Sequence, residues 1–279
     1  MINQFPLRQN INEAVESLKD KGVAEPHLAI VLGTGLGKLV DQIEIIQSIE
    51  YSTIPHFAIS TVETHNGRLI YGVLAGKKVI ALQGRFHYYE GYNMKQITFP
   101  IYVLKALGVK YLFISNAAGN MNLDWKKGEL MLLDDHINLL PENPLRGEND
   151  ESVGLRYPDM SSPYSRELND LIKKSAIELN ENLREGIYIS VQGPNLETRA
   201  EYRMLRNMGA DVVGMSTVPE VIAANHIALP VAAISVLTDD CDPDNLKPAN
   251  ITEILKIAGI AETRLSELLK LSIQKLPSP

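Results

Sequence analysis

The feature that most constrains the fold is a regular alternation of helical and strand-like segments along the second half of the chain. From residue 164 onward, the patterns predict helices at 165–180, 197–208, 218–227 and 251–275, and strands at 186–192, 211–215 and 230–237. Strands that alternate with helices in this way are typical of α/β folds. We therefore expect a central mixed, twisted sheet that is flanked by helices.

The first half of the chain fits the same architecture. It predicts helices at 10–20 and 94–107, strands at 27–32 and 110–115, and a hairpin formed by 69–74 and 78–83 around Ala75-Gly76. The Pro-, Gly-, Asn- and Ser-rich stretch 141–163 is predicted to be a long surface loop, not a linker. Because no linker or repeat interrupts the alternation, we expect one domain over residues 1–279.

Composition limits the classes of function. The chain has 279 residues, 45% of them hydrophobic, a net charge of −7 and one cysteine. Scattered basic residues argue against nucleic-acid binding, and a lone Cys241 leaves no disulfide framework and no cysteine-based zinc site. The first residues lack a signal-peptide pattern, and no apolar run is long enough to cross a bilayer. We expect a soluble cytoplasmic protein with no membrane partner and no bound metal.

Glycines follow the first predicted strand, in the run Gly33-Thr34-Gly35-Leu36-Gly37. Glycines at this place let backbone amides turn toward an anion, but they also form plain structural turns. The dinucleotide fingerprint requires G-x-G-x-x-G, and here the third glycine comes one residue early. A nicotinamide-dependent dehydrogenase therefore stays a weaker alternative.

The densest cluster of chemical groups is the run Gly84–Tyr92, GRFHYYEGY, at the end of a predicted strand. Arg85 offers donors that match phosphate oxygens, and His87 can hydrogen-bond to phosphate or to a sugar hydroxyl. Glu90 can fix the tautomer of the histidine. The alternative is an exposed aromatic turn with a surface ion pair.

Further polar segments follow other predicted strands, where α/β folds place their ligands. They are Ser115–Asn120, Gly193–Thr198, Val213–Thr217 and Thr238–Asp244. Thr217-Val218-Pro219-Glu220 has the form of a capping box and predicts the start of a helix. Asp240, Asp242 and Asp244 imitate the first ligands of an EF-hand, but Asn245 and Ile251 replace the required Gly and Glu. We expect most of these strand-end segments to converge on one pocket.

Taken together, the motifs resemble those of the trimeric purine nucleoside phosphorylases over about residues 27–250. The matching segments are GTGLG, THNGRL, GRFHYYEGY, NAAG, DHINL, GPNLET and GADVVGMSTVPEV, in the order and at spacings compatible with that family. The resemblance implies a phosphorylase/hydrolase-like fold. It also implies phosphorolysis of purine ribonucleosides or 2′-deoxyribonucleosides to free base and (2-deoxy)ribose 1-phosphate, in purine salvage. Phosphate would be a co-substrate, with no cofactor.

The resemblance also implies roles for individual residues. The phosphate site would use Thr34, His65, Arg85, His87, the Ala117 amide and Ser216. Ribose would lie against Tyr89 and Met215, and the purine site would use Leu196, Glu197, Gly214, Thr238 and Asp239. His87, Glu90 and Asp239 are the expected catalytic residues. Tyr157 matches an aromatic residue that reaches into a neighbouring subunit's site, which implies a homotrimer.

Two residues depart from the pattern of the resembled family. Asp239 stands where enzymes specific for inosine and guanosine have Asn, and an ionised Asp cannot donate to purine N7. Either repulsion by Glu197 keeps Asp239 protonated as a donor, or Asp239 accepts from a 6-amino group, as in methylthioadenosine phosphorylases. Ile251 replaces a histidine that contacts the 5′-hydroxyl. S-methyl-5′-thioadenosine phosphorylase is therefore the second candidate, and a non-catalytic nucleoside-binding protein is a candidate of another class.

Overall fold

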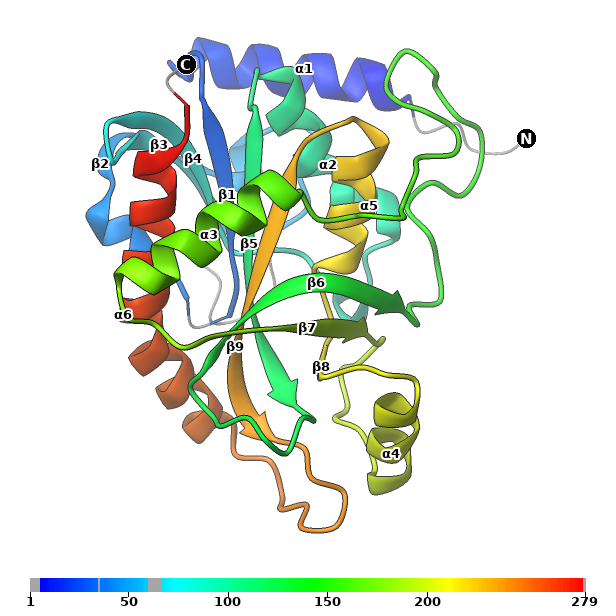
Figure 1. The fold of residues 1–279 in the computed structure, drawn as a ribbon. Helices are drawn as coiled ribbons and strands as arrows, with labels where there is room; N and C mark the ends of the chain where they lie inside the picture. The colour runs from blue at the N-terminus through cyan, green and yellow to red at the C-terminus, as the bar shows by residue number, and fades with distance from the viewer. Residues whose placement is uncertain (1–5, 35, 60–66, 278–279) are drawn as a thin grey trace.

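In the described part of the chain, nine strands form one mixed sheet. The computed structural model describes residues 6–34, 36–59 and 67–277 (Figure 1). The strands are β1 Leu28–Leu32, β2 Glu44–Glu50, β3 Arg68–Leu74, β4 Lys77–Gln83, β5 Tyr111–Asn120, β6 Leu130–Asn138, β7 Leu183–Ser190, β8 Val212–Gly214 and β9 Val231–Asp240. Their order is β2-β3-β4-β1-β5-β8-β7-β6-β9, and β5 also pairs with β9. That last pairing closes β5, β8, β7, β6 and β9 into a ring.

Helices cover both faces of this sheet, so the fold has three layers (Figure 1). The helices are α1 Leu7–Asp20, α2 Met94–Ala106, α3 Arg166–Glu178, α4 Arg199–Asn207, α5 Val218–His226 and α6 Ile251–Lys275. The buried apolar side chains of α1, α2 and α5 form one cluster with one face of the sheet, and those of α3 and α6 form a second cluster with the other face. The expected α/β fold class is therefore confirmed.

Strand direction decides where the polar segments meet. β4, β1, β5 and β9 run parallel to one another, because the β1–β4, β1–β5 and β5–β9 pairs are all parallel. Their carboxyl ends therefore lie on the same side of the sheet. β7 and β8 are parallel to each other, but β8 runs antiparallel to β5, which it meets at Gly119 and Asn120. The segment that follows β8 therefore returns toward the middle of β5, where Thr217 contacts Asn116.

The structure differs from the sequence-based expectations in three details. β2 and β6 were not among the predicted strands. Six of the seven β2 residues are exposed and only Ile49 is buried, so no alternation of buried and exposed residues marks this edge strand. β5 and β9 continue past the predicted ends to Asn120 and Asp240, because the two strands pair with each other through their polar ends. β7 begins at Leu183, three residues earlier than 186.

Candidate functional site

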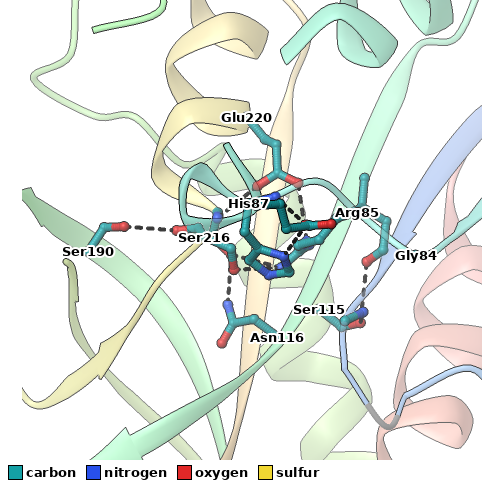
Figure 2. Close-up of polar contacts among 12 residues, drawn as sticks. Gly84, Arg85, His87, Ser115, Asn116, Ser190, Ser216 and Glu220 are labelled. Atoms are coloured by element: carbon teal, nitrogen blue, oxygen red, sulfur yellow. Dashed lines mark hydrogen bonds and ion pairs between the residues drawn. The ribbon is translucent and has the colours of Figure 1, made fainter. Parts of the chain in front are cut away.

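A buried arginine lies at the centre of one polar cluster (Figure 2). Arg85, only 4% exposed, follows β4. Its Nη1 donates to Ser216 Oγ at 2.8 Å and to Thr217 Oγ1 at 3.3 Å, and its Nε lies 3.2 Å from Glu220 Oε1. Residues 85 and 216 are thus brought together, as the strand-end argument predicted. A guanidinium and hydroxyls in this arrangement suit an oxyanion ligand.

The turn before α5 has a strained backbone. Thr217 has φ 69° and ψ −53°, and the Val218 amide donates to the Ser216 carbonyl at 2.8 Å, which together describe a γ-turn of the rare positive-φ kind. The Thr217 amide donates to Glu220 Oε2 at 2.7 Å, so the predicted helix start is confirmed. Asn116 Nδ2 donates to Thr217 Oγ1 at 3.0 Å. Such strain occurs most often at functional sites, where the surroundings hold the backbone in place.

His87 lies beside the arginine and is oriented by Glu90. Glu90 Oε1 accepts from the His87 amide at 2.7 Å and lies 3.0 Å from its Nδ1. Because an ionised carboxylate can only accept, Nδ1 carries a proton and Nε2 is the nitrogen directed elsewhere. The imidazole stacks on the Tyr89 ring at 4.7 Å between centroids. Burial raises the pKa of Tyr89 to about 12, so this phenol stays neutral.

The start of the glycine loop packs directly on β5. The Gly33 amide donates to Ser115 Oγ at 3.3 Å, and a Cβ at Gly33 would lie 2.7 Å from the Ser115 carbonyl oxygen. Glycine is therefore required here for close approach to a backbone. Thr34 follows on the same loop and is half-buried. Two predicted parts of this region, Gly35 and His65, lie outside the described residues.

β5 connects this cluster to a second polar region. Asn116 and Ala117 lie at its middle, and Gly119 lies at its end. On the partner strand β9, Leu237 pairs with Ala118 and Asp239 pairs with Gly119, so Thr238 is the extra residue of a β-bulge. A bulge re-aims the side chains around it. Its consequence here is that Asp239 leaves the core and lines an open cavity.

This cavity, of about 990 Å³, is lined by Leu196, Glu197, Thr238 and Asp239 among others. Glu197 lies one residue before Thr198, the N-cap of α4. Burial raises the pKa of Glu197, a hydrogen bond from Tyr202 opposes that shift, and the charge of Asp239 adds to it. Glu197 and Asp239, the predicted carboxyl pair, therefore line the same cavity. Both must do so if they are to bind one edge of the same base.

Both oxygens of Asp239 accept hydrogen bonds from the protein. Thr238 Oγ1 donates to Oδ1 at 2.8 Å, and Cys241 Sγ donates to Oδ2 at 3.4 Å. The Asp239 carboxylate is therefore held in one orientation by donors on both of its oxygens.

The remaining predicted residues are placed less centrally. Gly214 ends β8 and Met215 follows it, and Met215 packs so closely on Gly193 that a Cβ at residue 193 would overlap the Met215 sulfur. Leu196 is 39% exposed at the cavity. Tyr157 is 85% exposed on the long loop, and Ile251 is 61% exposed at the start of α6. A single chain does not bring Tyr157 into either polar region.

Sequence reasoning missed three contributors to the site. Glu220 was assigned to helix capping, yet it also pairs with Arg85. Cys241 was considered only for disulfides and metals, and Tyr202 not at all, although both lie beside the carboxyl pair. No sequence signal marked these two, because their contacts depend on how α4 packs against β9.

Metal ligation and membrane insertion find no support in the described residues. Within 6–34, 36–59 and 67–277, no three His, Cys, Asp or Glu side chains gather as they would around a metal ion. Among the helices of these same ranges, none has the length and apolarity to cross a membrane.

Comparison with known proteins agrees with this arrangement. Residues 27–274 match the family model described as the phosphorylase superfamily. Purine nucleoside phosphorylase 1 of Bacillus subtilis is 44% identical over 264 residues, which cover 95% of this chain and 97% of that protein. Purine nucleoside phosphorylase of Bos taurus is also 44% identical, over 90% of each chain.

Solved structures give the same result. A crystal structure of Schistosoma mansoni purine nucleoside phosphorylase in complex with adenosine superposes with a TM-score of 0.91 at 40% identity, covering 97% of this chain and 98% of that one. The complex with inosine gives a TM-score of 0.92 at 39% identity and the same coverage. By fold, sequence and the order of its strand-end motifs, the chain belongs to the phosphorylase superfamily and, within it, to the purine nucleoside phosphorylases.

Proposed function

We propose that this protein cleaves purine nucleosides with inorganic phosphate, giving a free base and ribose 1-phosphate. The observation that carries the proposal is the placement of two polar regions along β5. A buried arginine with a hydroxyl at 2.8 Å lies on one side, and two carboxyl groups lie in a cavity on the other. An anion and a heterocycle bound there would flank a ribose between them.

The polar region around Arg85 is assigned to phosphate. Arg85 and the Ser216 hydroxyl would contact its oxygens, together with Thr34 and the Ala117 amide, and His65 is proposed nearby on the sequence resemblance alone. His87, with Nδ1 held by Glu90, would present Nε2 to phosphate, either donating as an imidazolium or accepting from a phosphate hydroxyl. Buried donors of this kind are worth more than they would be in water.

The reaction would proceed by charge stabilisation. As the bond from C1′ to N9 lengthens, ribose gains positive charge, and phosphate beneath it supplies both an opposing charge and the nucleophile. Electrons of the breaking bond pass to the purine, and the new bond forms between C1′ and a phosphate oxygen. Tyr89 and Met215 would hold the ribose between the two regions.

The base would form hydrogen bonds with Glu197 and Asp239. Leu196, Gly214 and Thr238 would form the walls of its site. Glu197 can accept from N1–H of a 6-oxopurine when ionised, or donate to N1 of adenine when protonated. Related Schistosoma mansoni enzymes have been solved in complexes with adenosine, hypoxanthine and inosine, which supports a relaxed 6-oxo preference in this chain.

We further propose a cytoplasmic homotrimer of one domain per chain, acting in purine salvage with no cofactor. The exposure of Tyr157, 85%, supports its proposed role in a neighbouring subunit's site, because a single chain leaves this aromatic ring in water. S-methyl-5′-thioadenosine phosphorylase activity is kept as a second candidate, favoured by Ile251 at the predicted 5′ position and by Asp239.

The test is release of free base from inosine, guanosine, xanthosine, adenosine and methylthioadenosine, each with and without phosphate. Phosphate-dependent release with formation of ribose 1-phosphate is expected for inosine and for adenosine. Release without phosphate would indicate a hydrolase, and no release would favour a non-catalytic binding protein. Faster turnover of methylthioadenosine than of any other nucleoside would favour the second candidate.

A further inference from the structure

A buried thiol lies between the protein core and the carboxylate of Asp239. Cys241, 1% exposed, directs its Sγ at Asp239 Oδ2, 3.4 Å away. The space for this thiol exists because residue 119 is glycine, since a Cβ there would lie 2.6 Å from Sγ. The thiol is thus packed in place and is not a side chain that samples several positions.

Tyr202 lies on the other side of the thiol. This tyrosine, 2% exposed, interacts with the Cys241 sulfur and with Glu197. Its hydroxyl has one proton and can donate to only one of these groups at a time, whereas the thiol directs its own proton at Asp239. Burial raises the pKa of the Cys241 thiol, so the thiol keeps its proton and remains a donor.

The two carboxyl groups consequently have unequal surroundings. Asp239 accepts from both Thr238 and Cys241, whereas burial and the charge of Asp239 raise the pKa of Glu197. Both oxygens of Asp239 are thus oriented by donors, and the charge of Asp239 favours the neutral form of Glu197. Two other charged groups lie nearby. The charge of Glu201 adds to the raised pKa of Glu197, and the charge of Asp239 adds to the raised pKa of Lys127, whose Nζ lies 3.7 Å from Asp240 Oδ2.

This arrangement matches one class of base. Asp239 can accept from the 6-amino group of adenine, and Glu197, when neutral, can donate to N1 of adenine. A 6-oxopurine presents the reverse pattern, with a donor at N1 and acceptors at O6 and N7. Selection among bases by hydrogen-bond pattern is strong when the site's polar groups are buried.

We propose that Cys241 is a positioning residue that holds the Asp239 carboxylate in the orientation of an acceptor and so determines the acceptance of 6-amino purines. The inference rests on the proposed phosphorylase activity. It assigns the control of base preference to a thiol that is not among the expected site residues. Cys241 does not touch the reacting atoms; it acts through Asp239.

The test compares Cys241→Val, which removes the donor at similar size, with Cys241→Ser, which keeps it. The readout is the ratio of kcat/KM for adenosine to kcat/KM for inosine, measured across pH. A thiol is a weaker donor than the groups for which about 1.5 kcal/mol is typical, so the ratio should fall by about three- to tenfold in C241V and stay within about twofold of the native ratio in C241S.

Leu205→Met is the matched control, because Leu205 packs in the same buried cluster as Cys241 and Tyr202 but has no polar group. This control should leave the ratio unchanged. If C241V does not fold, Cys241→Ala removes the same hydrogen-bond donor and replaces it in the test. An unchanged ratio in the donor-free variants, an equal fall in C241S or L205M, or a native enzyme inactive on adenosine would each overturn the inference. Native protein that releases no base from either nucleoside would instead overturn the proposed function.

Discussion

Replacing Glu220 with glutamine should strongly destabilise the protein without phosphate, because it leaves the Arg85 charge buried without its acid. The two side chains are 3% and 5% exposed and lie 3.2 Å apart. At an effective dielectric constant of about 20, the attraction across that distance is roughly 5 kcal/mol. Part of this lost attraction is offset, because a neutral glutamine side chain costs less to bury than a charged glutamate. The expected loss in free energy of unfolding is about 3 to 5 kcal/mol, as for other broken buried pairs.

Phosphate should restore much of this loss, since an anion at Arg85 would supply the missing negative charge. Urea unfolding is followed at one protein concentration, with and without phosphate. At about 100 times the dissociation constant, a ligand that binds only the folded state adds about 2.7 kcal/mol. We expect Glu220→Gln to bind phosphate more tightly than the native protein, and therefore to gain more at any given phosphate concentration.

Glu201→Gln is the control, because Glu201 has the same capping position in α4 but is exposed. Glu201 Oε2 accepts from the Thr198 amide at 2.7 Å, just as Glu220 accepts from Thr217. Its replacement should cost much less stability than the replacement of Glu220 and should not change the response to phosphate. The reasoning is refuted if Glu220→Gln unfolds within about 0.5 kcal/mol of the native protein, or if phosphate stabilises both to the same extent.

Three further outcomes are expected. Ser216→Ala removes the hydroxyl that Arg85 contacts at 2.8 Å, so KM for phosphate should rise at least about tenfold in steady-state assays while KM for inosine changes little. Gly33→Ala places a methyl group 2.7 Å from the Ser115 carbonyl and should lower the unfolding free energy by about 1 to 3 kcal/mol in urea titrations. The pKa of Glu197 is raised above its ordinary 4.5, so its neutral form favours folding at low pH and this contribution is lost as pH rises through the raised value. Glu197→Gln should therefore lose less stability than the native protein between about pH 4 and pH 7, and equal slopes in urea unfolding would contradict this.

Much of the fold could be predicted because its signals are local. Helix α5 begins at Val218, as the Thr217 to Glu220 motif indicated, and the hairpin of β3 and β4 turns at Ala75 and Gly76, both with positive φ. The edge strand β2 escaped prediction because its largely exposed residues depend on pairing with β3, which is a tertiary contact. The same reason explains the extended ends of β5 and β9.

The candidate site was predictable only to the level of segments. Arg85 and Ser216 each follow a predicted strand, and the structure places them in contact although β8, which precedes Ser216, runs antiparallel to β5. Which residues contact each other within the site could not be predicted in the same way. Glu220 pairs with Arg85 across 135 positions, and the contact of Tyr202 with Cys241 joins a helix to the end of a distant strand. Such contacts depend on packing, which a pattern of residue types does not encode.

The ring formed by β5, β8, β7, β6 and β9 has a mechanical consequence for specificity. A strand that is paired on both sides cannot shift along its neighbour without breaking two ladders, and a shift of one residue would turn every side chain to the opposite face. The spacing between the proposed anion and base sites is therefore a property of the scaffold that holds the bulge at Thr238 in place. On the proposed function, substitutions at residues 239, 241 and 251 would alter which nucleoside is accepted while that spacing stays constant.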